Sequence, residues 1–148
     1  MPVPIKQTPV TPAWDRVSAL LVLALGAFMA ALLLQATPDP RGFGTHEQLG
    51  MVPCGWPPSG GIPCPTCGAT TAACYLVHLS PLAAVATHPF GAVVAAVGLW
   101  MSGWAAFCLI MGRSFLDPLV RLRWGSITIW TLVLFLGSWA YKYFSFLQ

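Results

Sequence analysis

The chain has 148 residues, of which 57% are hydrophobic and only 7% are charged. Soluble domains carry about 25% charged residues, so this composition excludes an ordinary soluble domain and predicts an integral membrane protein with the lipid bilayer as its surroundings. The formal net charge of +3 is small and scattered along the chain, which argues against a nucleic-acid partner.

The N-terminal segment, residues 1–16, contains four prolines and no helical period, and it is predicted to be an extended tail. Residues 17–36 follow without a charge. A helix needs about 20 residues to cross the hydrocarbon layer, so this segment predicts a first transmembrane helix. A cleaved signal peptide is the alternative, but its apolar core usually has about 7 to 15 residues.

A long loop, residues 37–89, comes next. Its first half is rich in glycine and proline and predicts irregular turns. Its second half becomes helical from Cys64, and Ser80 followed by Pro81 is typical of a helix cap followed by a first-turn proline. We therefore expect two short apolar helices in the membrane interface, near 65–79 and 81–88.

Two further apolar segments, residues 90–111 and 126–147, predict the second and third transmembrane helices. Small residues on the second of the three spans predict close helix packing there, at Gly91, Gly98, Ser102 and Gly103. The predicted fold class is therefore an all-α integral membrane protein with three transmembrane helices and two short interfacial helices in a cysteine-rich outer loop.

The basic loop 112–125 decides the predicted orientation. It holds three arginines against one aspartate, and the positive-inside rule places it in the cytoplasm. Two spans lead back from it to the N-terminus, so residues 1–16 are also expected in the cytoplasm, in agreement with Lys6 and Arg16. The loop 37–89 and the C-terminus then face outward.

Four of the five cysteines fall in the outer loop, while Cys108 in the second span is expected to be a buried, inert thiol. An oxidising compartment outside the cytoplasm favours a structural disulfide. If a helix begins near Cys64, then Cys64 and Cys67 lie one turn apart and can be bridged, and Cys54 on flexible chain can reach either of them. Cys67 and Cys74 are about 10.5 Å apart along a helix and cannot be bridged.

The segment Cys64-Pro-Thr-Cys-Gly also has the form of a zinc knuckle. A structural zinc needs four ligands, and one knuckle supplies two of them. His78 is excluded from an ion shared with the knuckle, because it lies about 16 Å from Cys67 along a continuous helix. The expected ligand set for zinc is Cys54, Cys64, Cys67 and either His46 or Cys74.

Thiol–disulfide exchange is a third interpretation, since a thiolate at a helix N-terminus has a lowered pKa and reacts readily. Cys64 would then attack, Cys67 would resolve and Cys54 would serve as a shuttle. The sequence contains no thioredoxin-type strand–helix frame, no Ser-His-Asp set, no paired carboxylates and no phosphate-binding glycine loop. A non-enzymatic protein without a cofactor is therefore favoured, with zinc as the alternative.

Four stretches of sequence resemble a known family: His46-Glu-Gln-Leu-Gly, Pro53-Cys54, Gly61-Ile-Pro-Cys-Pro-Thr-Cys-Gly-Ala-Thr-Thr-Ala and His88-Pro-Phe-Gly. They are similar to the bacterial membrane proteins grouped as domain of unknown function 2752. The shared core of that family is a Cys-Pro-x-Cys-Gly-x-Thr segment, followed by a short helix and an Asn/Gln-Pro turn into a membrane span.

This resemblance implies a protein of the bacterial inner membrane whose outer loop and C-terminus face the periplasm, and it implies no activity. The chain departs from the family pattern at Leu79, where many relatives have glycine, and at His88, where Asn or Gln is usual. We expect the two threonine hydroxyls of the core to bond back to carbonyls of the preceding turn. The structural residues that the resemblance indicates are Cys54, Cys64, Cys67, Gly68, Thr70 and Thr71.

The predicted function is that of an accessory or scaffold subunit of a larger membrane complex, together with other membrane subunits. The small size, the lack of a complete catalytic set and the seven tryptophans, which suit lipid and partner interfaces, favour it. A disulfide is the favoured form of its cysteine site. A thiol–disulfide exchange protein that uses Cys64 and Cys67 and a zinc-knuckle membrane protein are the alternatives.

Overall fold

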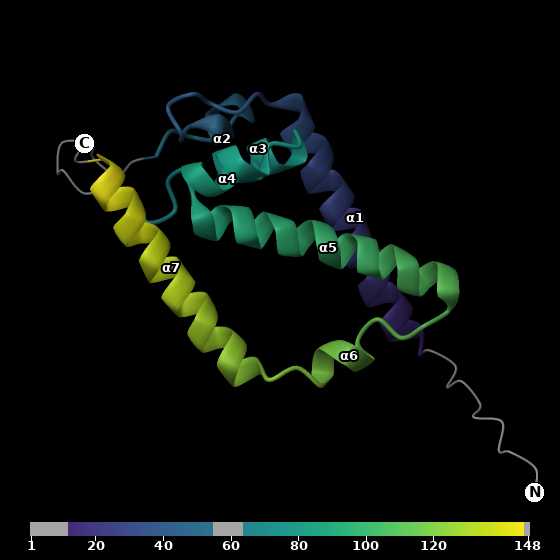
Figure 1. Ribbon diagram of the computed structural model, residues 1–148. Helices are drawn as coiled ribbons and strands as arrows, with labels where there is room; N and C mark the ends of the chain where they lie inside the picture. The colour runs from purple at the N-terminus through teal and green to yellow at the C-terminus, as the bar shows by residue number, and fades with distance from the viewer. Residues whose placement is uncertain (1–11, 55–63, 147–148) are drawn as a thin grey trace, which may run out of the picture.

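The computed structural model describes residues 12–54 and 64–146. All regular structure in these two ranges is helical, and no strand occurs in them (Figure 1). The helices in chain order are α1 (Ala13–Gln35), α2 (Thr45–Gln48), α3 (Ala69–Val77), α4 (Pro81–Thr87), α5 (Pro89–Met111), α6 (Asp117–Val120) and α7 (Trp124–Phe146). The all-α prediction is confirmed for this part of the chain.

Two helices among the described residues, α1 and α5, are long and apolar enough to cross a membrane. They pack against each other, yet most of their large apolar side chains point away from the protein; Leu21 is 66% exposed and Trp100 is 64% exposed. Leaving such side chains in water costs about 1.5–3 kcal/mol each relative to burial. The two helices therefore indicate a protein associated with a membrane.

Small residues allow α1 and α5 to approach closely. A methyl group added to Gly26 of α1 would overlap the side chain of Ser102 in α5, and one added to Gly91 would overlap the backbone of Ala69 at the start of α3. Close packing at Ser102 and Gly91 is thus confirmed. The same prediction is wrong for two other glycines of α5, since open space surrounds Gly98 and Gly103.

A buried carboxylate joins the start of α1 to the segment that follows α5. Asp15 is only 2% exposed. Its Oδ1 accepts hydrogen bonds from the Ser114 hydroxyl at 3.0 Å and the Leu116 amide at 2.9 Å, and its Oδ2 accepts one from the Phe115 amide at 3.1 Å. These bonds hold the buried Phe115 ring in a small core with Cys108, whose predicted burial is confirmed.

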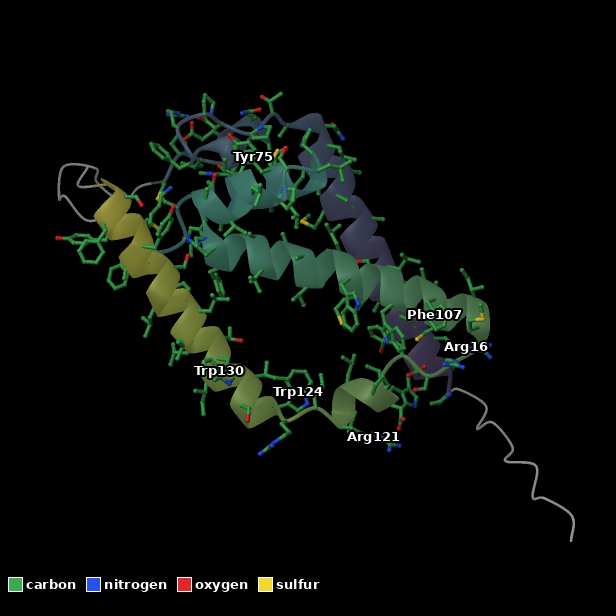
Figure 2. The ribbon with its side chains drawn as sticks, in the orientation of Figure 1. Arg16, Tyr75, Phe107, Arg121, Trp124 and Trp130 are labelled. Carbon is green, nitrogen blue, oxygen red and sulfur yellow. The ribbon has the colours of Figure 1, made fainter. Side chains whose placement is uncertain are left out.

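The third long helix, α7, covers nearly the range predicted for a third span, but it is not among the described helices that are apolar enough to count as candidate spans. It reaches the rest of the protein through its C-terminal half and diverges from α5 toward α6 (Figure 1). Every residue of 124–133 is exposed. Trp124 and Trp130 lie on the N-terminal half of α7, away from α1 (Figure 2).

The shorter helices differ from the prediction in number and extent. Neither α2, in the segment predicted to be irregular, nor α6, in the basic loop, was expected. The helix expected near 65–79 begins only at Ala69, because Gly68 adopts the left-handed conformation with φ 96°. Leu79 ends this helix with φ 59°, at a cost of about 1–2 kcal/mol that glycine would avoid.

We predict that Asp15→Ala lowers the free energy of unfolding by about 3 kcal/mol, because it leaves buried amides without an acceptor. The effect is measured by thermal unfolding in detergent micelles. Asp117→Asn is the matched control: its carboxylate forms an exposed ion pair with Arg121 at 3.1 Å, which contributes little. Equal destabilisation by the two substitutions would contradict the role of Asp15.

Candidate metal centre

Three cysteine side chains of the outer loop converge. The Sγ atoms of Cys54, Cys64 and Cys67 lie within 4.8 Å of one another, and the Cys67 thiol donates to Cys54 Sγ at 3.6 Å. A disulfide needs an S–S distance of about 2.05 Å, so none of these sulfurs is at bonding distance. Two thiolates on one tetrahedral zinc, each at about 2.3 Å, lie about 3.8 Å apart. The spacing suits a shared metal ion, and the favoured disulfide is not confirmed.

A tight turn positions two of these thiols. The Cys67 amide donates to the Cys64 carbonyl at 3.1 Å, and this turn ends before α3 begins. Gly68 follows the turn, and a Cβ at this position would collide with the Gly42 carbonyl oxygen. The prediction that Cys64 and Cys67 are one turn apart on a helix is therefore wrong. The need for glycine at position 68 agrees with the Cys-x-x-Cys-Gly pattern of a zinc knuckle.

Two of the three thiols differ in how readily they ionise. Partial burial disfavours a thiolate at Cys64, but hydrogen bonds from Thr66 and from the other two thiols outweigh burial and lower the pKa of Cys64. Burial, the hydrogen bond to Cys54 and the negative charge of Cys64 raise the pKa of Cys67 to about 12. Without a cation the cluster therefore accommodates one thiolate more readily than three.

The predicted fourth ligands lie outside the cluster. Cys74 is fully buried on α3, and its thiol donates to the carbonyls of Leu33 and Ala36 at 3.4 and 3.5 Å, near the end of α1. His46 lies on α2 and does not belong to the group of converging ligand atoms. His78 has its Nδ1 2.9 Å from the Cys74 carbonyl oxygen. Neither His46 nor Cys74 completes a four-ligand site in the structure.

The two threonines of the family core also have distinct surroundings. Thr71 is fully buried and accepts a hydrogen bond from the Thr45 hydroxyl at 2.9 Å, which ties α2 to α3 across 26 residues of sequence. Thr70 lines an apolar cavity of about 530 Å³ between α1, α3 and α5. Thr71 therefore has a role that the sequence did not indicate, a contact between two segments.

A buried histidine connects the cysteine turn to the long helices. His88 is 1% exposed, and its Nδ1 accepts the Gly91 amide at 3.0 Å and lies 3.2 Å from the Ser138 hydroxyl of α7. Because Nδ1 is an acceptor, the neutral ring carries its hydrogen on Nε2, which donates to the Pro65 carbonyl at 3.0 Å. The sequence offered one signal for this role, the His-Pro start of a helix.

Lys142 brings a positive charge from α7 to the same region. Its ammonium group donates to the carbonyls of Gly42 and Thr87 at 3.3 and 3.4 Å, and it lies beside Gly68, the residue after Cys67. The contact with Thr87 places a cation at the C-terminus of α4. A lone charged residue in an apolar segment was the sequence signal for this role, because such residues usually have a specific partner.

We predict that the protein loses stability as the pH falls from about 6.5, with a slope of up to about 1.4 kcal/mol per pH unit. Burial lowers the pKa of His88, and the charge of Lys142 adds to this shift although the Pro65 carbonyl opposes it. The unfolded chain therefore takes up a proton at a pH where the folded chain does not. Thermal unfolding between pH 8 and 5 measures the effect. His88→Asn keeps an acceptor for the Gly91 amide and should flatten the profile; an unchanged slope would contradict this assignment.

Comparison with known proteins places this segment in a family. Residues 58–102 match the model of a family described as Protein of unknown function (DUF2752). The match includes the turn of Cys64 and Cys67, α3, α4 and the first part of α5, but not Cys54. No curated protein and no solved structure matches the chain. The resemblance seen in the sequence is therefore confirmed for residues 58–102, which are similar to the DUF2752 family.

Proposed function

We propose that the protein is a small membrane-anchored metal-binding protein in which Cys54, Cys64 and Cys67 hold one thiophilic ion, with zinc as the expected metal. The observation that carries this proposal is the convergence of three Sγ atoms within 4.8 Å, contributed by two separate stretches of chain. Sulfur ligands suit zinc and other soft ions. A metal uses all three cysteines, whereas one disulfide would leave the third thiol unexplained.

Charge supports the same proposal. A divalent ion offsets the repulsion between neighbouring thiolates, which is one of the causes that raise the pKa of Cys67 to about 12. The knuckle directly precedes the N-terminus of the nine-residue helix α3, where the backbone dipole favours negative charge. Lys142 adds a positive charge beside Gly68, the residue after Cys67. The surroundings are therefore suited to an anionic metal–thiolate group.

The proposal includes α7 as a third membrane helix. Its length of 23 residues is sufficient to cross a bilayer. Two of the polar residues that reduce its hydropathy have partners inside the protein: Ser138 accepts the Phe90 amide at 3.2 Å, and Lys142 binds two carbonyls. With three spans, the positive-inside rule puts the arginine-rich loop in the cytoplasm and the cysteine cluster outside the bacterial inner membrane.

An accessory role in a larger membrane assembly is the proposed setting of this site. The exposed half of α7 supports it, because Trp130 is 71% exposed and Ile129 is 63% exposed. Within the bilayer such a face contacts either lipid or a neighbouring membrane helix. The N-terminal half of α7, where every residue of 124–133 is exposed, makes few contacts with the rest of the described protein.

Thiol–disulfide exchange is the second candidate function, and the lowered pKa of Cys64 favours it. The Cys64 thiolate would attack a substrate disulfide, form a mixed disulfide and release one substrate thiolate. The thiolate of Cys67 or Cys54 would then attack the Cys64 sulfur, releasing the second substrate thiolate and leaving a disulfide within the protein. The substrate is reduced by two electrons and the protein is oxidised by two.

We predict that the purified reduced protein binds one zinc per chain, and that serine at position 54, 64 or 67 weakens zinc binding by more than about tenfold. Metal analysis and competition with a chelating dye measure this. Cys74→Ser is the matched control, because a serine hydroxyl can still donate to the Leu33 and Ala36 carbonyls. In protein purified without reductant, an intact mass two protons below the reduced value, with no zinc, would contradict metal binding and show a disulfide, either structural or exchanging.

We predict that the C-terminus lies outside the cytoplasm. Alkaline phosphatase fused after the last residue should be active in bacteria, because this enzyme folds only in an oxidising compartment, whereas a fluorescent protein fused there should be dark. A phosphatase fused after Gly112, directly behind α5, should be inactive and serves as the control. Active enzyme at both positions, or at neither, would exclude α7 as a third span.

A further inference from the structure

We propose that the metal of the cysteine cluster keeps one coordination position for a sulfur donor from outside the chain, a thiolate supplied by a small thiol or by the cysteine of another protein. This inference rests on the proposed metal-binding function and specifies its ligand. A zinc ion takes four ligands, and sites with three protein ligands hold a fourth, exchangeable one. The fourth position is open to an outside donor only if no other side chain of this protein can fill it.

Every cysteine, histidine, aspartate and glutamate of the sequence falls within the described residues, because 1–11, 55–63 and 147–148 contain none of these four types. The converging group nevertheless has only three members. The fourth ligand therefore has to come from one of the other described side chains by rearrangement, or from another molecule.

Most of the other candidates are engaged elsewhere. The two nitrogens of His88 bind the Gly91 amide and the Pro65 carbonyl. Asp15 holds the segment after α5, and Asp117 pairs with Arg121. The remaining two carboxylates share one guanidinium: Arg41 lies 2.8 Å from Asp39 and 3.5 Å from Glu47.

Cys108 is buried in the core that α5 forms with α1, and His78 has its Nδ1 2.9 Å from the Cys74 carbonyl oxygen. The last two loop candidates, Cys74 and His46, have structural positions of their own. The thiol of Cys74 is buried against the end of α1, so its use as a ligand would require α3 to separate from α1. His46 belongs to α2, whose neighbour Thr45 is fully buried in a hydrogen bond with Thr71 of α3. Rearrangement of either residue would break contacts that join two helices.

The open position is accessible and suits an anionic sulfur donor. Cys54 is exposed and the other two cysteines are partly exposed, so an external ligand can approach the cluster. Three thiolates on a divalent ion leave a net charge of −1, and a fourth thiolate makes it −2. The ammonium group of Lys142, which lies beside Gly68, the residue after Cys67, offsets part of this charge. Soft thiolate ligands are preferred by the metals that a cysteine cluster selects.

Cobalt(II) reports the number of sulfur ligands, because each cobalt–thiolate bond adds charge-transfer absorbance in the near ultraviolet. The reduced full-length protein in detergent micelles is loaded with cobalt without oxygen and titrated with free cysteine. We expect three-thiolate absorbance at the start and a saturable rise of about one third as a fourth thiolate binds. Acetate at the same concentrations should cause no such rise. A single-cysteine peptide, titrated in parallel, distinguishes a protein thiol from a small one as the preferred source.

Each alternative has its own signature. Four-thiolate absorbance before any addition, with a mass twice that of the chain, would show that a second copy fills the position and would overturn the proposal. A spectrum unchanged by thiol would overturn it as well, as would loss of a ligand in His46→Ala, which is expected to behave as wild type. Failure to bind cobalt or zinc at all would overturn the metal-binding function itself, a distinct result.

Discussion

The buried imidazole of His88 is the contact on which the arrangement of this protein depends. Its Nδ1 accepts the Gly91 amide in the first turn of α5 and lies within hydrogen-bond distance of the Ser138 hydroxyl of α7. Its Nε2 donates to the Pro65 carbonyl in the cysteine turn. Three segments that are distant in sequence therefore meet at one side chain. Because both ring nitrogens have fixed partners, a proton added to the ring would replace an acceptor by a donor and disrupt the capping of α5.

The long helices are held together by polar contacts at their two ends and by close packing of small residues between those ends. Lipid is as apolar as the helix surfaces, so burial from water does not drive helices together within a bilayer. Asp15 locks α1 to the segment behind α5 at one end, and His88 and Lys142 join α5, α7 and the loop at the other. Between them, Gly26 lets α1 approach Ser102 closely. These directional bonds fix the arrangement that apolar contacts leave open.

The cysteine cluster brings three thiols together, and their thiolates repel one another. Ionising all three thiols within 4.8 Å of one another is unfavourable because like charges repel. In agreement with this, the pKa of Cys64 is lowered while that of Cys67 is raised. The cation that we propose for this site would offset the repulsion between the thiolates. The cluster is built on a loop, but this loop is attached to the long helices: Pro65 accepts a hydrogen bond from His88, which caps α5, and Gly68 lies beside Lys142 of α7. The cysteine turn and α7 are thus direct neighbours.

The sequence alone determined the membrane character, the bounds of α5 to within one residue and the short helix after Ser80, because apolar length and capping residues act over a few residues. The start of α3 was misplaced, since the left-handed Gly68 interrupts an otherwise helical pattern. Tertiary structure decided which thiols meet: it brought Cys54 to the knuckle and turned Cys74 toward α1. It also gave His88 and Lys142 their partners, which lie 23 to 100 residues away. No local pattern encodes such contacts, because they depend on how the finished helices pack.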